Sequence, residues 1–335
     1  MRVLPAVLGA LLAGAASAAE PPSLGLPPSL GLPIDCTLGR DCWILQYPDL
    51  DAGPGWTDHT CGPRSYDGHS GVDFGIRDLA AMRRGVRVLA AAPGVVAVAR
   101  DGIDEEGRTL SDPAIAGREC GNAVRLTHGD GWETLYCHMR KGSVVVRAGQ
   151  TVAAGDTLGL VGQSGAAVMP HVHLQVNRDG RWVDPYLGEP PERARCGAKG
   201  KPLWSKAARD AVAYSGADIT AIGFAPEKPE PARVEAGDYP DTLPRDAKAV
   251  NLWARIYGGR AGDRLSMRLL APDGAVLSEA STTLPANKIR VDLSIGRDRL
   301  AGLWPPGAYR GEVALDRDGA KPLRRRAEAV LTVTP

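Results

Sequence analysis

Residues 120–137 read CGNAVRLTHGDGWETLYC, and this stretch decides the class of fold. Two runs that alternate apolar and polar residues flank the turn sequence HGDG, which is the pattern of a β-hairpin. Cys120 and Cys137 lie at nearly equal distances from this turn. Because a hairpin brings such residues opposite each other, we expect the two cysteines to form a disulfide.

The same pattern continues along the rest of the chain, which predicts an all-β protein. Over residues 36–200, runs such as RVLAAAPGVVAVAR alternate with Gly and Asp-Gly turns, which predicts an antiparallel β domain. Residues 222–335 contain no cysteine and alternate around PDG and RDG turns, which predicts a small β-sandwich of immunoglobulin-like type. Between them, residues 201–221 contain SKAARDAVAYSGAD and are expected to form a short helical connector.

The first 35 residues indicate that the protein is exported. Residues 1–18 run from Arg2 through an apolar stretch to a small-residue triplet, the layout of a cleaved secretory signal. The apolar stretch is shorter than the roughly 20 residues that span a bilayer, so we expect no transmembrane segment after signal removal and a periplasmic or extracellular location. Residues 19–35 repeat Pro, Ser, Leu and Gly, which predicts a linker or an ordered extended arm.

The charge balance argues against polyanionic partners. Lys and Arg number 40 and Asp and Glu number 39, for a formal net charge of +1. Such a chain creates no long-range field that would concentrate nucleic acid or anionic lipid. We therefore expect no nucleic-acid partner; the oligomeric state stays open, with a monomer as the expectation.

The six cysteines all precede residue 197, and an even set suits an oxidising compartment. Besides the hairpin pair, Cys36 and Cys42 could close the short loop CTLGRDC, which would leave Cys61 to join Cys196 and tie both ends of one domain together. A cysteine metal site is disfavoured because the sequence lacks a C-x-x-C spacing.

Residues 101–119, DGIDEEGRTLSDPAIAGRE, form a polar segment without strand periodicity that is too long for a hairpin turn. Loops of this length are either functional or tolerated at the surface. Both interpretations stay open.

The two histidines of PHVHLQV, residues 170–176, either have a function or only occupy a strand. In a strand, His171 and His173 project from one face while the valine and leucine side chains project from the other. One face of the strand would then pack against the core, and the other would be free for polar chemistry. The alternative is a half-exposed strand that carries two histidines by accident.

Two further motifs supply possible partners for these histidines. In DGHSGVDFG, residues 67–75, His69 and Asp73 are four positions apart; the glycines make a strand or turn more favourable than a helix and permit close backbone approach. In LYCHM, His138 ends the second arm of the hairpin.

Together the motifs have the inventory of a catalytic zinc site, which takes three protein ligands and keeps one position open. His69, Asp73 and one member of the pair His171 and His173 would supply two imidazoles and one carboxylate. The other member would then act as a proton carrier. Zinc lowers the pKa of a bound water toward about 7, and His138 could add a second proton donor or a hydrogen bond to developing charge.

The order GHSGVDFG, TLYCHM, AGQTVAAGDTLGLVGQSG, MPHVHLQV and DGRWVDP resembles peptidase family M23, the LytM or lysostaphin-type zinc endopeptidases. The resemblance covers roughly residues 60–190. It implies a small antiparallel β domain with one Zn²⁺ at the floor of a groove, and a substrate among the peptides of bacterial peptidoglycan. The chain departs from the common pattern at Met169, where Gly is more frequent, and in the long loop 101–119.

The resemblance also implies a role for each residue. His69, Asp73 and His173 would bind zinc, His171 would be the catalytic base, and His138 would polarise or stabilise the attacked carbonyl. The leading hypothesis is an exported zinc metalloendopeptidase that cleaves peptidoglycan peptides. The alternatives are a catalytically silent protein that binds the wall or activates a hydrolase, and a zinc peptidase that acts on proteins.

Overall fold

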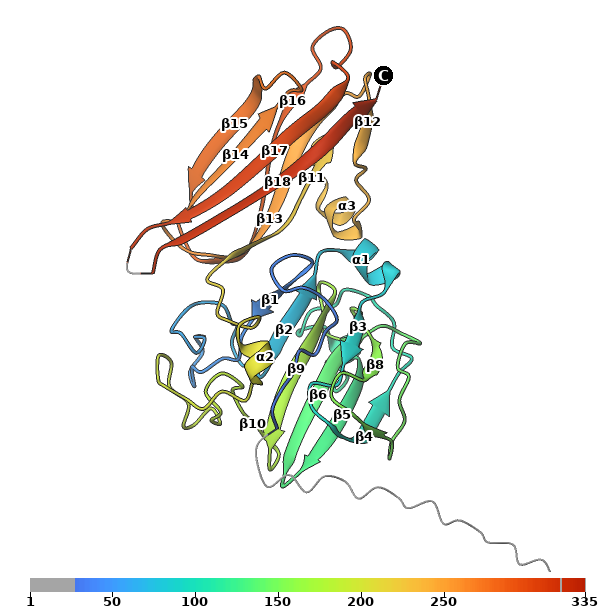
Figure 1. Cartoon of the computed structure of the whole chain (residues 1–335), viewed down its shortest axis with the longest axis vertical. Helices are drawn as coiled ribbons and strands as arrows, with labels where there is room; N and C mark the ends of the chain where they lie inside the picture. Colours follow the sequence, from blue (N-terminus) through green and yellow to red (C-terminus); the bar gives the residue numbers. More distant parts are fainter. Residues whose placement is uncertain (1–27, 320, 335) are drawn as a thin grey trace, which may run out of the picture.

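The computed structural model describes residues 28–319 and 321–334 (Figure 1). The expected secretory signal, residues 1–18, lies outside the described residues. The fold is nearly all β, with antiparallel sheets and a few short helices, as the sequence predicts. In the described ranges no helix is long and apolar enough to cross a membrane.

An eight-stranded antiparallel sheet forms the lower half of the molecule in Figure 1. Seven strands follow the order β1-β2-β9-β6-β5-β4-β7, and β10 pairs with β9. Their bounds are β1 (Cys42–Gln46), β2 (Val72–Ile76), β4 (Gly94–Arg100), β5 (Asn122–Gly129), β6 (Trp132–Met139), β7 (Thr151–Val152), β9 (His171–Arg178) and β10 (Arg181–Trp182). The remaining elements here are β3 (Arg87–Leu89), which pairs with β8 (Thr157–Leu160), and the short helices α1 (Leu79–Arg84), η1 (Pro113–Ile115) and α2 (Lys206–Arg209).

The predicted hairpin is present as β5 and β6. Gly129 pairs with Trp132, so the connection has two residues, Asp130 and Gly131, with φ of 46° and 74°. Positive φ at both positions is the requirement of a type I′ turn, and Asp-Gly is one of the sequences that meets it. The turn therefore sets the register that brings the two cysteines of the hairpin together.

The two faces of β9 divide as the alternation predicts. Val172 and Leu174 are fully buried and belong to the main apolar core. The opposite face presents His171 and His173, and His173 pairs in register with Asp73 of β2. The strand pairing of β2 with β9 thus places two of the three motifs side by side.

Three disulfides fix this half of the chain. Cys120 bonds to Cys137 across the hairpin, Cys36 bonds to Cys42, and Cys61 bonds to Cys196. The bond across the hairpin is the pairing that the sequence predicted; the other two are pairings that the sequence had left open.

The described part of the Pro-rich segment is an ordered extended arm, one of the two predicted alternatives. Leu30 N donates to Leu203 O at 2.8 Å, and Leu89 N donates to Pro33 O at 2.8 Å. Leu30 and Ile34 are almost completely buried in the main core. The arm therefore closes one side of the eight-stranded sheet's core.

The C-terminal half folds as two facing sheets (upper half of Figure 1). One contains β11 (Asp218–Ala225), β13 (Ala249–Gly259) and β16 (Lys288–Asp298); the other has the order β12 (Thr242–Pro244), β18 (Leu323–Thr334), β17 (Gly307–Arg317), β14 (Arg264–Leu270) and β15 (Val276–Thr283). Helix α3 (Pro231–Ala236) connects β11 to β12. Phe224, Leu252, Met267, Tyr309 and Leu331 from both sheets share one core, so this unit is a β-sandwich; its immunoglobulin-like type stays a prediction.

The expected helical connector over residues 201–221 is mostly not helical. Its helix α2 has only four residues, and β11 already begins at Asp218. Val212 is buried, and Tyr214 stacks on Tyr47 with ring centroids 5.0 Å apart. Packing on the neighbouring sheet therefore overrides the helix propensity of the Ala and Arg pattern.

Candidate metal centre

Three side chains from the predicted motifs converge at the junction of β2 and β9. Asp73 Oδ1 lies 3.1 Å from His69 Nε2 and 2.8 Å from His173 Nδ1. The two histidine nitrogens lie 3.1 Å apart. All three residues are buried, so the cluster is a compact group of nitrogen and oxygen donors shielded from bulk water.

The donor set fits a tetrahedral metal ion. Zinc binds nitrogen and oxygen at about 2.0–2.2 Å in a tetrahedron, which separates its ligand atoms by about 3.3 Å. The observed separations of 2.8–3.1 Å come within a few tenths of an ångström of that value. The described residues contain one other group of this kind, Cys36, Asp41 and Cys42, whose cysteines are joined in a disulfide and offer no thiolate.

Backbone contacts orient the first histidine of the cluster. His69 Nδ1 lies 2.8 Å from Tyr47 O. Because a carbonyl only accepts, Nδ1 donates its hydrogen to Tyr47 O, which leaves Nε2 as the nitrogen that would bind a metal. A carbonyl on the second nitrogen is a common partner of metal-binding histidines.

Gly71 makes room for the ring of His173. A Cβ atom on residue 71 would lie 2.4 Å from His173 Nε2 and 2.6 Å from Leu174 O. Only glycine permits this approach, which agrees with the close backbone contact expected from the glycines of DGHSGVDFG.

The electrostatics of the cluster favour an ionised Asp73 and a neutral His173. For His69, burial opposes protonation, but the charge of Asp73 and the hydrogen bond to it outweigh burial and raise the pKa. Burial opposes ionisation of Asp73, but His69 and His171, with a hydrogen bond from His173, outweigh burial and hold the pKa of Asp73 well below its usual value. Burial also lowers the pKa of His173. At neutral pH Asp73 is therefore an anion and His173 is neutral, the forms that bind a metal.

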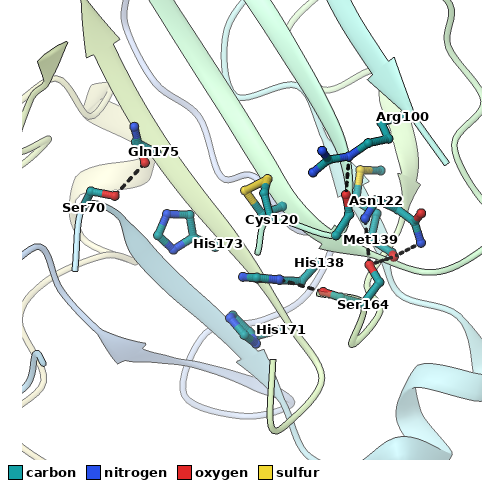
Figure 2. The surroundings of a disulfide bond; sticks show 12 residues. Ser70, Arg100, Cys120, Asn122, His138, Met139, Ser164, His171, His173 and Gln175 are labelled. Atoms are coloured by element: carbon teal, nitrogen blue, oxygen red, sulfur yellow. Dashed lines mark hydrogen bonds between the residues drawn. A yellow bond between two sulfur atoms is a disulfide. The ribbon is translucent and has the colours of Figure 1, made fainter. Parts of the chain in front are cut away.

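Two further histidines border the cluster. His171 Nδ1 lies 2.9 Å from Met169 O, and His171 Nε2 lies 3.7 Å from Asp73 Oδ1. His138 Nδ1 lies 2.8 Å from Ser164 O, and its ring centroid is 4.6 Å from that of His171. Figure 2 shows the rings of His138, His171 and His173 gathered together, with Ser164 on the far side of His138. In both bordering residues Nδ1 donates to a carbonyl, so Nε2 of the neutral ring is an acceptor.

His138 has an unusual backbone. Its φ is 63°, a region that residues other than glycine rarely adopt,. The pairing of β5 with β6 shifts register between Asn122 and Val124, and His138 N donates to Cys120 O at 2.9 Å. Strained backbone of this kind often occurs at functional sites. The irregularity turns His138 toward the cluster while Cys137 remains bonded to Cys120.

The electrostatic setting of His138 keeps its ring neutral. Burial, followed by the charges of His171 and His173, holds its pKa well below the usual value.

The remaining histidines lie elsewhere. His59 stacks on Tyr186 with ring centroids 4.1 Å apart, and His128 hydrogen-bonds to Pro93 O and Thr134 Oγ1. The sequence motifs located the five residues of the centre. They did not reveal the carbonyls of Tyr47, Met169 and Ser164 that orient three of the rings, because a backbone carbonyl has no sequence signature.

A His, Asp and His donor set with two further histidines beside it is the set of residue types found in metallohydrolase centres. The profile of peptidase family M23 matches residues 67–185, which include all five residues. Over these residues, about a third of the chain, the protein is similar to peptidase family M23.

The chain is also similar to several known proteins. An uncharacterized metalloprotease of Haemophilus influenzae is 32% identical over 117 residues, 35% of this chain and 20% of the relative. The peptidoglycan DD-endopeptidase ShyA of Vibrio cholerae is 32% identical over 116 residues, 35% of this chain and 22% of the relative. A solved variant of the catalytic domain of the prophage-encoded M23 protein EnpA from Enterococcus faecalis is 22% identical, covering 51% of this chain and 97% of that one, with a TM-score of 0.30. The chain spans about a fifth of the length of the curated relatives it matches.

Proposed function

We propose that the chain is an exported zinc-dependent metalloendopeptidase that cleaves peptide bonds in cell-wall peptidoglycan. The convergence of His69 Nε2, Asp73 Oδ1 and His173 Nδ1 within 3.1 Å of one another is the observation that carries the proposal. A relative named as a peptidoglycan DD-endopeptidase supports the substrate. Three disulfides support export, because disulfides persist in oxidising compartments.

His69, Asp73 and His173 would hold the zinc. When bound, zinc polarises the scissile carbonyl and lowers the pKa of an attacking water. The chain's own contribution is to fix these donors through Tyr47 O and through the space left by Gly71.

His171 would move the proton. Its Nδ1 is held by Met169 O, so its Nε2 accepts a proton from the attacking water and returns it to the leaving amine. This assigns His171 as the general base and acid of the reaction.

His138 would assist in a more limited way. With Nδ1–H held by Ser164 O, its neutral Nε2 accepts a hydrogen bond and orients the water. Nε2 can donate to a developing oxyanion only after it has taken up a proton, and burial opposes that step.

The test is digestion of purified peptidoglycan by the zinc-loaded full chain, with mass analysis of the fragments to identify the bond. His173→Ala and Asp73→Ala are compared with Asp67→Ala, which changes an exposed carboxylate of the same motif. We expect loss of both zinc and digestion in the first two and neither in the control. Full digestion without bound metal would refute the mechanism. Bound zinc without digestion would favour a wall-binding or activating role, and cleavage of casein alone would favour a protein substrate.

A further inference from the structure

The C-terminal sandwich lies directly against the metal centre. Tyr257 of β13 is buried in an apolar cluster with Trp43, Leu45 and Met169 of the metal-binding half. The Tyr257 hydroxyl donates to Met169 Sδ at 2.7 Å. Since Met169 O holds His171, the sandwich contacts the residue that positions the proposed base.

A buried arginine joins the two halves nearby. Arg64 Nη1 donates to Ser215 O at 2.6 Å and to Asp218 Oδ2 at 2.8 Å, and Nη2 donates to Ile44 O. A Cβ atom on Gly258 would lie 2.9 Å from Arg64 Cδ. These contacts hold the sandwich in one place relative to the centre.

A pocket of about 310 Å³ lies where the two halves meet, beside the metal centre. Asp73 and His171 line it, and the loop 101–119 contributes Arg108, Thr109 and Leu110. The sandwich contributes three residues, Tyr257, Ile289 and Arg290. The pocket is therefore continuous with the reacting centre and is bounded by segments from both halves of the chain.

The rim of this pocket is apolar. Leu110 of the loop, Val168 before β9 and Ile289 of β16 are 58%, 55% and 40% exposed, and all three line the pocket. Exposed aliphatic side chains that meet from three separate segments mark a binding surface more often than a chance arrangement.

The cations that reach the pocket are already neutralised. Arg290 pairs with Asp292 at 2.8 Å and with Glu235 at 3.3 Å, and Arg255 pairs with the same two carboxylates at 3.0 Å each. This network of two cations and two anions has no net charge.

The cation that the loop 101–119 contributes to the pocket is also paired with carboxylates. Arg108 pairs with Asp112 at 2.6 Å and also with Glu106, which leaves one excess negative charge. Apart from the proposed zinc, a substrate carboxylate would find no cation without a carboxylate partner among the described residues that line the pocket, and it would meet repulsion at the loop.

From these observations we infer that the C-terminal sandwich forms one wall of the substrate pocket, where Ile289, with Leu110 and Val168, selects an uncharged aliphatic side chain such as that of alanine. The inference rests on the proposed peptidase function for the nature of the substrate. The sandwich is then a specificity element of the enzyme.

The test measures binding of tetra-alanine, and of the same peptide with one alanine replaced by glutamate, to the zinc-loaded full chain. A His171→Gln background prevents turnover, and calorimetry gives the dissociation constants. In this background Ile289→Asp is compared with Val276→Asp, which places the same charge at a similarly exposed valine of β15 that is outside the pocket.

We expect tetra-alanine to bind about tenfold more tightly than the glutamate peptide, the scale of discrimination in apolar pockets. Ile289→Asp should weaken tetra-alanine binding about tenfold and Val276→Asp less than about twofold. Equal binding of the two peptides, no measurable binding, or equal effects of the two variants would overturn the inference. Peptidoglycan digestion that is insensitive to Ile289→Asp would refute the inference alone, whereas selective tetra-alanine binding without peptidoglycan digestion would refute the proposed function alone.

Discussion

Gly71 lies against the ring of His173 so closely that a Cβ atom on residue 71 would stand 2.4 Å from Nε2. Gly71→Ala should therefore push His173 Nδ1 away from Asp73 and His69. We expect zinc affinity to fall at least roughly tenfold, as for other residues that orient metal ligands. Competition with a zinc chelator measures the affinity. Gly31→Ala is the control, because its Cβ would meet only an ordinary contact of 3.5 Å with Ala91 O; equal affinities in the two variants would contradict the prediction.

Substitutions of His171 and of His173 should have different effects on zinc binding and on the rate of hydrolysis. His173→Ala removes a proposed ligand, so it should lose both zinc and activity. His171→Ala should keep its zinc and lose about 10²- to 10⁴-fold in rate, the usual contribution of a general base. Metal analysis and hydrolysis assays on the same samples provide the comparison. A His171→Ala chain that loses zinc as completely as His173→Ala would show that the division of roles is wrong.

Arg64 should be a major source of stability where the two halves meet. Arg64→Met leaves the carboxylate of Asp218 without its closest cation in a nearly dry site, so the free energy of unfolding should fall by about 3 kcal/mol. Adding Asp218→Asn should restore part of that loss, because the unpaired charge is then removed.

Urea unfolding of the two single variants and the double variant measures this coupling. Arg40→Ala, which breaks an exposed pair with Asp41, should cost less than about 1 kcal/mol. Strict additivity of the two core substitutions would argue that Arg64 and Asp218 do not stabilise each other.

Asp184 should make stability depend on pH. Burial raises its pKa to about 7 from the usual 3.8. The folded chain therefore keeps a proton that the unfolded chain releases, and the free energy of unfolding falls as pH rises from about 4 to about 7, by roughly 4 kcal/mol in total.

The measurement is urea unfolding across this pH range for the parent chain and for Asp184→Asn. Burial lowers the pKa of His59 to about 4, so stability from His59 is lost as pH falls through the same interval, with the opposite sign. The difference between the two proteins cancels His59 and isolates Asp184. A difference that is constant across the pH range would contradict the assignment.

The sequence predicted the parts of the fold that local chemistry determines. The turn at Asp130 and Gly131 sets the hairpin register, and alternation in residues 171–176 separates the ligand face from the packing face. Both depend on neighbours within a few residues. The connector expected over residues 201–221 is helical only at Lys206–Arg209, because Val212 and Tyr214 pack on distant residues, which a local propensity does not include.

The pocket could not be predicted because its walls come from distant parts of the chain. Tyr257 and Met169 are 88 residues apart in sequence, and no sequence pattern links the two. Met169 stood out only as a departure from the usual glycine. The loop 101–119, whose role the sequence left open, contributes Arg108, Thr109 and Leu110 to the same pocket.

The bond between Cys61 and Cys196, separated by 135 positions, closes residues 61–196 into a covalent ring. His69, Asp73, His138, His171 and His173 all lie inside that ring. Closing a loop of this length removes several kcal/mol of chain entropy from the unfolded state, about 4–5 kcal/mol by the loop-entropy relation. In the unfolded closed loop, residues 69 and 173 are nearer to each other on average than in an open chain, so an oxidised chain begins refolding with the proposed ligands closer together than a reduced chain does.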